Sequence, residues 1–594
     1  MKNREDVEKS NRSDNRPFSS VLTSYSSRRR VLRGSLELAA AVFFASSPAM
    51  AEPKGKARGR SKLIDFEPVP VEGGGGAMPR IAEDYEMQFI IPWGDPINPS
   101  SGPAFDWPPS AADQALQIGK GHDGMWYFPL DKSGNRGLLA LNHEYGFRID
   151  FTGDFSNPFR AESLDEVRVS QHAHGVSILE LASVNGQWQH VDSGYSRRIH
   201  VNTPVEFSGP AAHSPRLQNP AGNPPAGTLN NCSNGHTPWG TYLTCEENVH
   251  FYFGDPGGTF VPDEFQQRYG FPFDFHGWAA FDPRFDLGNA DYANECNRFG
   301  WVVEIDPTDP TAPPVKRTAL GRFRHEGCAV TVGRGGRAVG YMGDDENGEY
   351  LYKFVSDKNW EALRAQGLSP LDHGKLYAAR FDDDGTGEWL LLSLENPLLA
   401  AEFNDEADVL MFARKAADIV GATPLGRPEW TAVGPDEQVY ATLTAGHDGE
   451  GSILRWRDSD HHVGTRFEWD VFVIASDTFD TEATFNEPDG LWADPDGRVF
   501  IQTDGRGQPS GLNDQMLVAD SATGEIRRLF EGVPGCEVSG ITVTPDRRTM
   551  FINVQHPGEF TGGTTFPHDP SEGIPVPRDA TVVIRRKDGG IVGS

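Results

Sequence analysis

The chain has 594 residues, with 54 Lys and Arg against 85 Asp and Glu, which gives a formal net charge of −31. Such an acidic surface repels polymeric nucleic acid and anionic lipid, so neither is an expected partner. The 66 Gly and 44 Pro residues argue against long uninterrupted helices, because both destabilise a helix interior. Short strands joined by many turns are therefore expected.

The N-terminus has the pattern of an export signal. Residues 27–33 (SRRRVLR) contain consecutive arginines, residues 36–46 are mostly apolar, and Ala49-Met50-Ala51 forms a small-x-small cleavage site. The apolar stretch is shorter than the about 20 residues that a membrane span needs. The sequence thus predicts a twin-arginine signal peptide over residues 1–51. The expected partner is the twin-arginine translocation machinery, the expected location is periplasmic or secreted, and no stable membrane insertion is expected.

The remainder of the chain divides into a linker and one domain. Residues 52–84 are rich in Lys, Arg, Gly and Pro and include the glycine run 73–76, which is typical of a flexible lead-in. Residues 85–594 are predicted to form a single catalytic domain. Within that domain, only residues 357–366 and 404–419 have the apolar spacing of helices.

A loose internal repeat organises the predicted domain. Each copy has a polar turn, an apolar strand, a Gly/Asp turn, a second apolar strand and a polar end. The copies are residues 121–144, 227–248, 325–346, 427–444, 486–505 and 536–556. Radial repetition explains why polar groups recur at the same two places in each copy. The predicted fold is all-β, a six-bladed β-propeller with inserted loops and short helices, and a β-sandwich of similar hairpins is the alternative.

In a propeller, the corresponding ends of the six copies meet at one mouth of the central channel. They would bring together Asp123, Glu144, Cys232, Glu246, Glu247, His325, Glu326, Asp344, Asp345, Arg427, Glu429, Asp489, Asp504 and Glu537. Carboxylates at this density cannot all remain ionised without cations or raised pKa values. Multivalent metal ions are the simplest solution, although any single acid could instead cap a turn.

The second copy contains the clearest candidate for a metal ligand. Cys232 lies in a turn rich in Gly and Asn, where a buried apolar thiol is unexpected, and a thiolate is a soft ligand suited to iron or zinc. Glu246 and Glu247 are adjacent, so only one of them can face the channel from a strand.

Two other copies contain a candidate ligand beside a His or an Arg. In the first, Glu326 is the candidate ligand, and the preceding His325 is better interpreted as a structural residue. Arg427 precedes Glu429 by two residues and, on an extended strand, would point to the same side of the sheet. A guanidinium there can bind phosphate or carboxylate bidentately. The alternative for Arg427 is an ordinary ion pair with Asp489.

Longer motifs resemble the PhoX-type alkaline phosphatases over nearly the whole mature chain. The motifs are NHEY (142–145), HGVSI (174–178), NNCSNGHTPWGTYLTCEEN (230–248), FGWVVEIDP (299–307), PVKRTALGRFRHEG (314–327), GDDENGEYLYKFVS (343–356), GATPLGRPEW (421–430), PDGLWADPDGRVFIQTDG (488–505), PGCEVSGITVTPD (534–546) and NVQHPGE (553–559).

The resemblance implies a secreted alkaline phosphatase, a phosphoric monoester hydrolase with an iron and calcium cluster in the propeller channel. Small phosphate esters would be its substrates. Cys232 looks like the iron-binding thiolate, and Arg427 looks like the catalytic arginine that holds phosphate. The other residues that look like metal ligands are Glu144, Glu247, Glu326, Glu429, Asp489, Asp504 and Glu537.

Two alternatives share the propeller. One is a calcium-dependent lactonase or esterase, which needs one calcium ion and no cysteine, so Cys232 and the surplus of carboxylates disfavour it. The other is a non-catalytic propeller that calcium stabilises and that binds a partner on its rim. Metal analysis together with a turnover assay separates all three.

Overall fold

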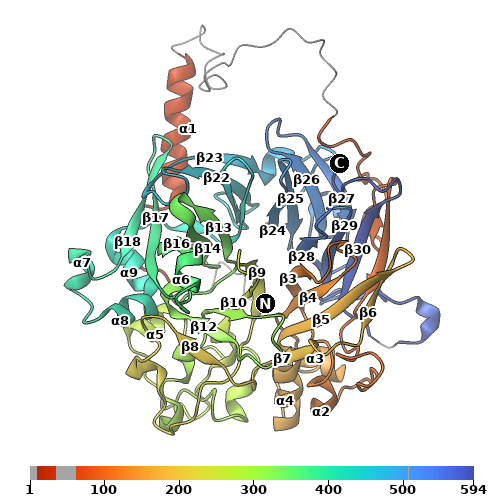
Figure 1. The fold of residues 1–594 in the computed structure, drawn as a ribbon, viewed down its shortest axis with the longest axis horizontal. Coiled ribbons are helices and arrows are strands. Elements are labelled where there is room, and N and C mark those ends of the chain that lie inside the picture. Colours follow the sequence, from red (N-terminus) through yellow and green to blue (C-terminus); the bar gives the residue numbers. More distant parts are fainter. Residues whose placement is uncertain (1–9, 35–61, 506, 575) are drawn as a thin grey trace.

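The computed structural model describes residues 10–34, 62–505, 507–574 and 576–594. Their regular structure is mostly β, with short helices, as the composition predicted (Figure 1). The helices are α1 (Phe18–Gly34), α2 (Ala111–Gln114), α3 (Arg148–Thr152), α4 (Leu164–Ala173), α5 (Glu264–Arg268), α6 (Trp360–Arg364), α7 (Pro397–Ala400), α8 (Glu406–Met411) and α9 (Ala413–Val420). Helix α6 falls within one predicted helical segment, while α8 and α9 account for the other. Among the described residues, no helix combines the length and apolar character that crossing a bilayer requires.

Each copy of the sequence repeat contains one antiparallel hairpin. The hairpins are β3 (His122–Pro129) with β4 (Arg136–His143), β9 (Asn231–His236) with β10 (Tyr242–Glu246), β13 (Ala329–Gly333) with β14 (Arg337–Gly343), β20 (Pro428–Val433) with β21 (Val439–Leu443), β24 (Pro488–Ala493) with β25 (Arg498–Thr503), and β28 (Glu537–Val543) with β29 (Thr549–Gln555). Apolar strands separated by Gly/Asp turns thus folded as the pattern predicted.

Further strands extend every hairpin into a larger sheet. They are β5 (Gly175–Val184), β6 (Gln187–Val191) and β7 (Arg197–Ile199) beside β4; β11 (Val302–Ile305), β12 (Val315–Arg317) and β8 (Glu206–Ser208) beside β10; β16 (Leu351–Asn359), β17 (Gly374–Phe381) and β18 (Thr386–Leu392) beside β14; β22 (Ser452–Asp458) and β23 (Arg466–Ile474) beside β21; β26 (Gln515–Asp520), β27 (Ile526–Glu531) and β1 (Arg80–Ile81) beside β25; and β30 (Ala580–Arg586) and β2 (Tyr85–Ile90) beside β29. Strands β18 and β23 also pair, which joins two of these groups into one nine-stranded sheet. A separate two-stranded sheet pairs β15 (Asn347–Glu349) with β19 (Leu425–Gly426).

The first strands of the six hairpins contact one another in a closed order. Strand β3 contacts β9, β9 contacts β13, β13 contacts β20, β20 contacts β24, β24 contacts β28, and β28 returns to β3. In an antiparallel hairpin, the start of the first strand lies beside the end of the second strand. The polar ends of the six copies are therefore brought toward a common centre.

Residues 62–84 differ from the prediction of a flexible lead-in. Ile64, Phe66 and Val69 are buried in the cluster that β24–β30 form, and β1 pairs with β27. The prediction rested on the abundant Gly and charged residues of this segment. It overlooked three apolar side chains that are close enough in sequence to pack together. The folded part therefore begins at or before residue 64, rather than near Tyr85. The predicted apolar stretch 36–46 and cleavage site 49–51 lie outside the described residues.

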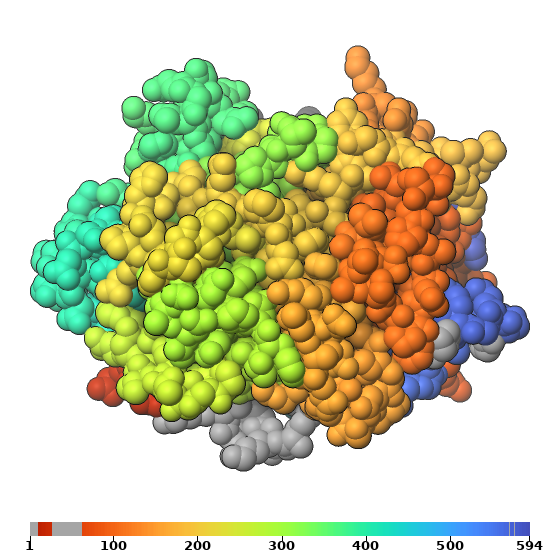
Figure 2. All heavy atoms as spheres, turned by 90° about the horizontal axis from the view of Figure 1, so that it is seen from below, coloured from red at the N-terminus to blue at the C-terminus, as the bar shows by residue number. Residues whose placement is uncertain are grey.

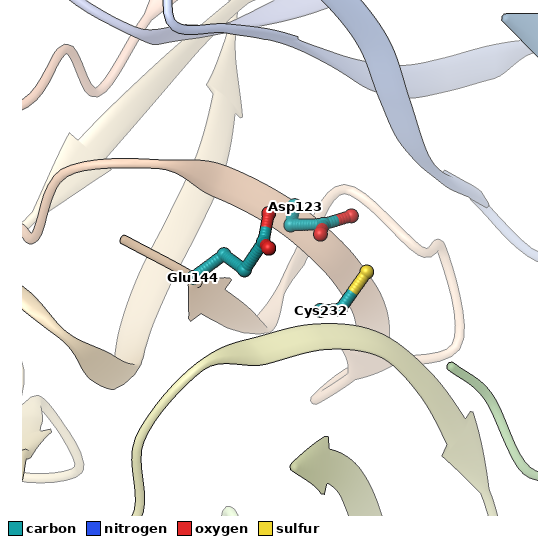
Figure 3. A group of neighbouring side chains, drawn as sticks. All are labelled: Asp123, Glu144 and Cys232. Atoms are coloured by element: carbon teal, nitrogen blue, oxygen red, sulfur yellow. The ribbon is translucent and has the colours of Figure 1, made fainter. Parts of the chain in front are cut away.

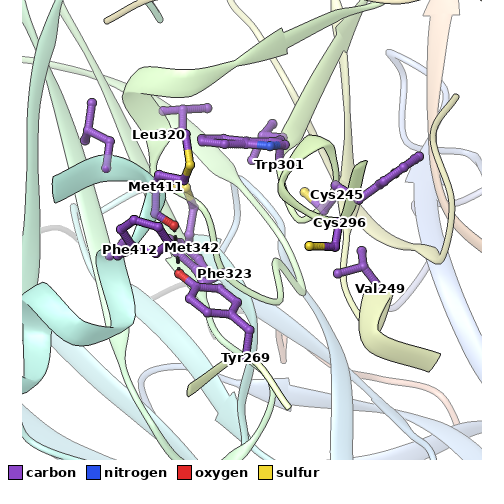
Figure 4. Close-up of a cluster of buried hydrophobic side chains, with 14 of the residues drawn as sticks. Cys245, Val249, Tyr269, Cys296, Trp301, Leu320, Phe323, Met342, Met411 and Phe412 are labelled. Atoms are coloured by element: carbon purple, nitrogen blue, oxygen red, sulfur yellow. Dashed lines mark hydrogen bonds between the residues drawn. The ribbon is translucent and has the colours of Figure 1, made fainter. Parts of the chain in front are cut away.

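Long connections between the hairpins cover one side of the molecule. Helices α2, α3 and α4 lie at the lower edge of Figure 1, and Figure 2 shows that side as orange, yellow and green segments packed against one another. A buried cluster beneath this side includes Cys245, Cys296 and Trp301, and the Tyr269 hydroxyl donates a hydrogen bond to the Met411 carbonyl oxygen at 3.1 Å (Figure 4). All five cysteines are free and buried.

Candidate metal centre

One cavity of about 1510 Å³ lies at the common centre of the hairpins. Its wall includes Arg427 and every residue that the sequence predicted as a metal ligand: Glu144, Cys232, Glu247, Glu326, Glu429, Asp489, Asp504 and Glu537. The predicted convergence of these side chains is therefore present in the structure.

The hairpins explain how distant residues reach one cavity. Glu429, Asp489 and Glu537 lie at or near the start of the first strands β20, β24 and β28. Glu144 and Asp504 directly follow the second strands β4 and β25. Both positions belong to the same end of an antiparallel hairpin, so each sheet delivers its acids from the same side.

Cys232 stands between two groups of acids. Its Sγ, Asp123 and Glu144 offer ligand atoms within 4.8 Å of one another, and the three side chains point toward a common space (Figure 3). Cys232, Glu247 and Glu326 form a second such group. The Cys232 thiol donates a hydrogen bond to Glu326 Oε1, with an S to O distance of 2.7 Å. A single thiol therefore belongs to two possible ion sites.

Two further groups were only partly anticipated. One contains Asp504, Glu537 and His556, and the other contains Glu326, Asp345 and Glu429. His556 was not predicted as a ligand, although it ends the sixth repeat copy immediately after β29, the same position that Glu144 occupies after β4. Position within the repeat was the signal that could have identified it.

The site is electrostatically costly in the absence of cations. Burial raises the pKa of Glu144 well above its usual range, and the neighbouring Glu247 and Asp123 raise it further. Burial, with Glu537 as the largest charged contributor, raises the pKa of Asp123 to about 8. Burial and Asp123 also raise the pKa of the Cys232 thiol well above its usual range. Multivalent cations would offset these effects and allow the groups to ionise.

The donor set suits iron and calcium. A thiolate is a soft ligand for iron, and carboxylate oxygens are the hard ligands that calcium takes in sets of 6–8. Asp123 Oδ2 and Asp489 Oδ1 are buried without a hydrogen-bond partner among the described residues. Gln555 Nε2 donates to Glu144 Oε2 and Glu537 Oε2, both at 2.9 Å, and so fixes two of the candidate ligands.

The backbone conformation and the partners of Arg427 differ from those that the sequence predicted. Its backbone φ is +52°, so the extended geometry expected at this residue is wrong, and β20 begins only at the next residue. Its Nε and Nη2 bind the two carboxylate oxygens of Asp345 at 2.8 Å, and Nη2 also lies 2.8 Å from Glu429 Oε1. The alternative of an ion pair with Asp489 is replaced by these two partners. Nη1 is buried without a hydrogen-bond partner among the described residues, and Arg427 belongs to the cavity wall.

Three polar residues of the predicted convergence have structural roles instead. Glu246 Oε1 pairs with Lys316 Nζ at 2.7 Å, and both side chains are at most 1% exposed. His325 Nε2 lies 2.9 Å from the Gly321 carbonyl oxygen, consistent with the structural interpretation. Asp344 pairs with the buried Arg414. Of the adjacent pair Glu246 and Glu247, only Glu247 lines the cavity, as the alternation of a strand required.

A mostly β fold whose hairpins converge on a cavity lined by carboxylates, the Cys232 thiol and the Arg427 guanidinium defines a protein with a candidate metal site suited to an anionic substrate. Comparisons with known proteins identify which one. The sequence matches the family described as Alkaline phosphatase PhoX over residues 65–558. The chain therefore belongs to the PhoX alkaline phosphatase family and is a phosphomonoesterase of that type, which confirms the resemblance seen in the motifs.

Solved structures support the same assignment. The chain is similar to PhoX of Pseudomonas fluorescens in complex with vanadate, a transition state analogue, at 44% identity and a TM-score of 0.82, over 90% of this chain and 100% of that one. A protein of unknown function from Dyadobacter fermentans follows at 12% identity and a TM-score of 0.37, over 79% of this chain and 97% of the other. That likeness is too distant to inform function. The comparison with curated proteins found no match.

Proposed function

We propose that this chain is an exported phosphatase in which a six-bladed β-propeller holds iron and calcium ions in its central cavity. The closed order of contacts among six first strands supports the propeller. The twin-arginine pattern in residues 27–33 supports export to the periplasm or beyond. Small phosphate monoesters are the proposed substrates, because the P. fluorescens relative was solved with vanadate as a transition state analogue.

The single observation that carries the metal assignment is the convergence of all the predicted ligands on one buried cavity. Cys232, shared between two groups of acids, would hold iron, and the remaining carboxylates would hold iron and calcium together. Such ions supply charge neutralisation of the phosphate and activation of a water molecule. His556, Asp123 and Asp345 join the proposed ligand set, since each contributes an atom to one of the groups within 4.8 Å.

Arg427 would hold the phosphate through Nη1. Asp345 already occupies its Nε and Nη2, which fixes the guanidinium plane, while Nη1 has no hydrogen-bond partner among the described residues. The sequence suggested that Arg427 binds phosphate bidentately. In the structure, its bidentate partner is Asp345 instead. A preoriented N–H stabilises the charge that develops on a phosphate oxygen without reorganisation during the reaction.

The test compares Cys232→Ser with Cys296→Ser. Cys296 is buried in the apolar cluster away from the cavity, so it controls for the loss of a buried thiol. The purified proteins are assayed for p-nitrophenyl phosphate hydrolysis and for iron and calcium by elemental analysis. We expect Cys232→Ser to lose iron and activity while Cys296→Ser retains both. Full iron retention in Cys232→Ser would reject the thiolate assignment.

A further inference from the structure

The segment before the twin-arginine pattern is packed against the folded body. Helix α1 buries Phe18, Val21 and Leu22, which recur at the spacing of one helix face. The Phe18 ring lies 5.3 Å from Phe381 and 5.2 Å from Trp469, measured between ring centroids. In Figure 1 this red helix rises from the region of β17 and β23. Burial of this face indicates a specific contact, because an unpacked leader would leave it exposed to water.

The residues before α1 form polar contacts with the β15 turn. Ser10 Oγ lies 2.9 Å from Glu346 Oε2 and 3.0 Å from Glu349 Oε1. Asn11 Nδ2 donates to the Gly348 carbonyl oxygen at 2.6 Å and to the Tyr350 hydroxyl at 2.9 Å. Side-chain and apolar contacts therefore hold both ends of the segment, which fixes its path over the surface.

That path passes along the cavity. Ser10, Arg12 and Ser13 belong to the same cavity wall as Cys232 and Glu326. Helix α1 also contacts β19, the strand that ends one residue before Arg427. Cys232 is buried whereas Arg12 is exposed, so the segment lies at the outer part of the cavity and the candidate metal ligands lie at its inner part.

We propose that residues 10–26 dock on the face formed by β15, β19 and the aromatic pair Phe381 and Trp469, and that the docked segment narrows the opening of the cavity. The chain that retains this segment would then discriminate against bulky phosphate esters, and loss of the segment would widen access. The occupant of this face is the N-terminal segment of the chain itself. The effect on substrate choice rests on the proposed phosphatase function, but the docking does not.

The test uses the full chain, produced without removal of the segment. Phe18→Asp/Leu22→Asp places two charges in the buried face, and burial of an unpaired charge is unfavourable, so the segment should detach. Ser19→Asp/Thr23→Asp adds the same charges to the exposed face of α1 and is the matched control. Hydrogen exchange of residues 10–26 and 346–350 measures docking in each protein. We expect faster exchange in both segments for the first variant alone.

The second measurement is the ratio of kcat/KM for a phosphoserine decapeptide to kcat/KM for p-nitrophenyl phosphate. We expect this ratio to rise roughly tenfold in Phe18→Asp/Leu22→Asp, because a wider opening lets the bulky decapeptide reach the transition state more readily. The ratio should remain unchanged in the control. An unchanged ratio in a variant whose segment has detached would overturn the narrowing of the cavity.

Two safeguards keep the outcomes separate. If Phe18→Asp/Leu22→Asp does not fold, Ser10→Ala/Asn11→Ala removes the contacts to the β15 turn without added charge, and it should shift exchange and the ratio in the same direction. If no protein hydrolyses either ester, the phosphatase proposal fails, while hydrogen exchange still decides the docking. Equal exchange of residues 346–350 in wild type and both variants would contradict it.

Discussion

Two adjacent glutamates should have opposite effects when each loses its charge. Glu246 is buried against Lys316, and its Oε2 also accepts from the Gly300 and Trp301 backbone N–H groups at 2.9 and 3.1 Å. Burial is the largest cause of the lowered pKa of Lys316, and the negative charge of Glu246 opposes it. The charged form of this ammonium therefore depends on its partner. Glu246→Gln removes the carboxylate charge that faces the ammonium, which keeps its hydrogen bond to the Arg298 carbonyl oxygen at 2.7 Å. Removing one partner of a buried ion pair costs about 3–5 kcal/mol.

Glu247, unlike Glu246, lies beside other acidic side chains. Burial, followed by Asp345, raises the pKa of its carboxyl well above the usual range. A neutral Gln at this position therefore relieves repulsion in the metal-free protein, but it removes a charged ligand from the loaded one. We expect Glu247→Gln to unfold no more easily than wild type without metal, and to bind less iron or calcium.

Chemical denaturation of the metal-free and loaded proteins, with elemental analysis, measures both effects. Glu246→Gln should lose about 3–5 kcal/mol of unfolding free energy in either form and keep its metal content. Glu247→Gln should lose the stability gained from metal, since an ion bound only to the native state stabilises it. Loss of metal in Glu246→Gln with unchanged stability would refute the division of roles between the two residues.

Three other predictions follow from separate contacts. Arg427→Ala should lower kcat/KM by about 10²-fold, as expected for loss of one preoriented donor. Arg427→Lys should recover little, because an ammonium cannot hold Asp345 bidentately while donating to phosphate. Wild-type kinetics in Arg427→Ala would exclude the phosphate contact. Chelation should lower the melting temperature and stop turnover, with calcium restoring both, because the freed carboxylates repel one another; an unchanged melting curve would count against a site of several ions. Burial alone would raise the pKa of Asp579, but Lys120 is the main group that lowers it to a net value below its usual range. This carboxylate therefore contributes stability above its unfolded pKa of about 3.9 that is lost as the pH falls below it, and Asp579→Asn should flatten the loss of melting temperature below about pH 4; an identical acid limb in the variant would contradict this.

Local patterns were sufficient to predict the hairpins and the convergence of the acidic residues on one cavity. The alternation of apolar strands and Gly/Asp turns fixes each hairpin locally, and repetition places the same end of each hairpin at one centre. For that reason Glu144, Asp489 and Glu537 reach one cavity although they lie far apart in sequence. Strand alternation also implied that only one of Glu246 and Glu247 would face the centre, and only Glu247 lines the cavity.

Features that depend on distant partners could not be predicted in this way. The positive φ of Arg427 and its ion pair with Asp345 occur beside the pairing of β15 with β19, which no local pattern indicates. The packing of Ile64 and Phe66 against the C-terminal sheets likewise depends on contacts with strands more than four hundred residues away. Composition favoured a flexible segment there, and the distant apolar surface determined the outcome.

The most direct test of the central claim is a crystal structure of the metal-loaded protein with anomalous diffraction recorded on both sides of the iron absorption edge. We expect an iron peak bonded to Cys232 Sγ, with further ions among the carboxylates of the same cavity. An iron peak elsewhere, or a cavity in which Cys232 binds no metal in a protein that hydrolyses phosphate monoesters, would contradict it.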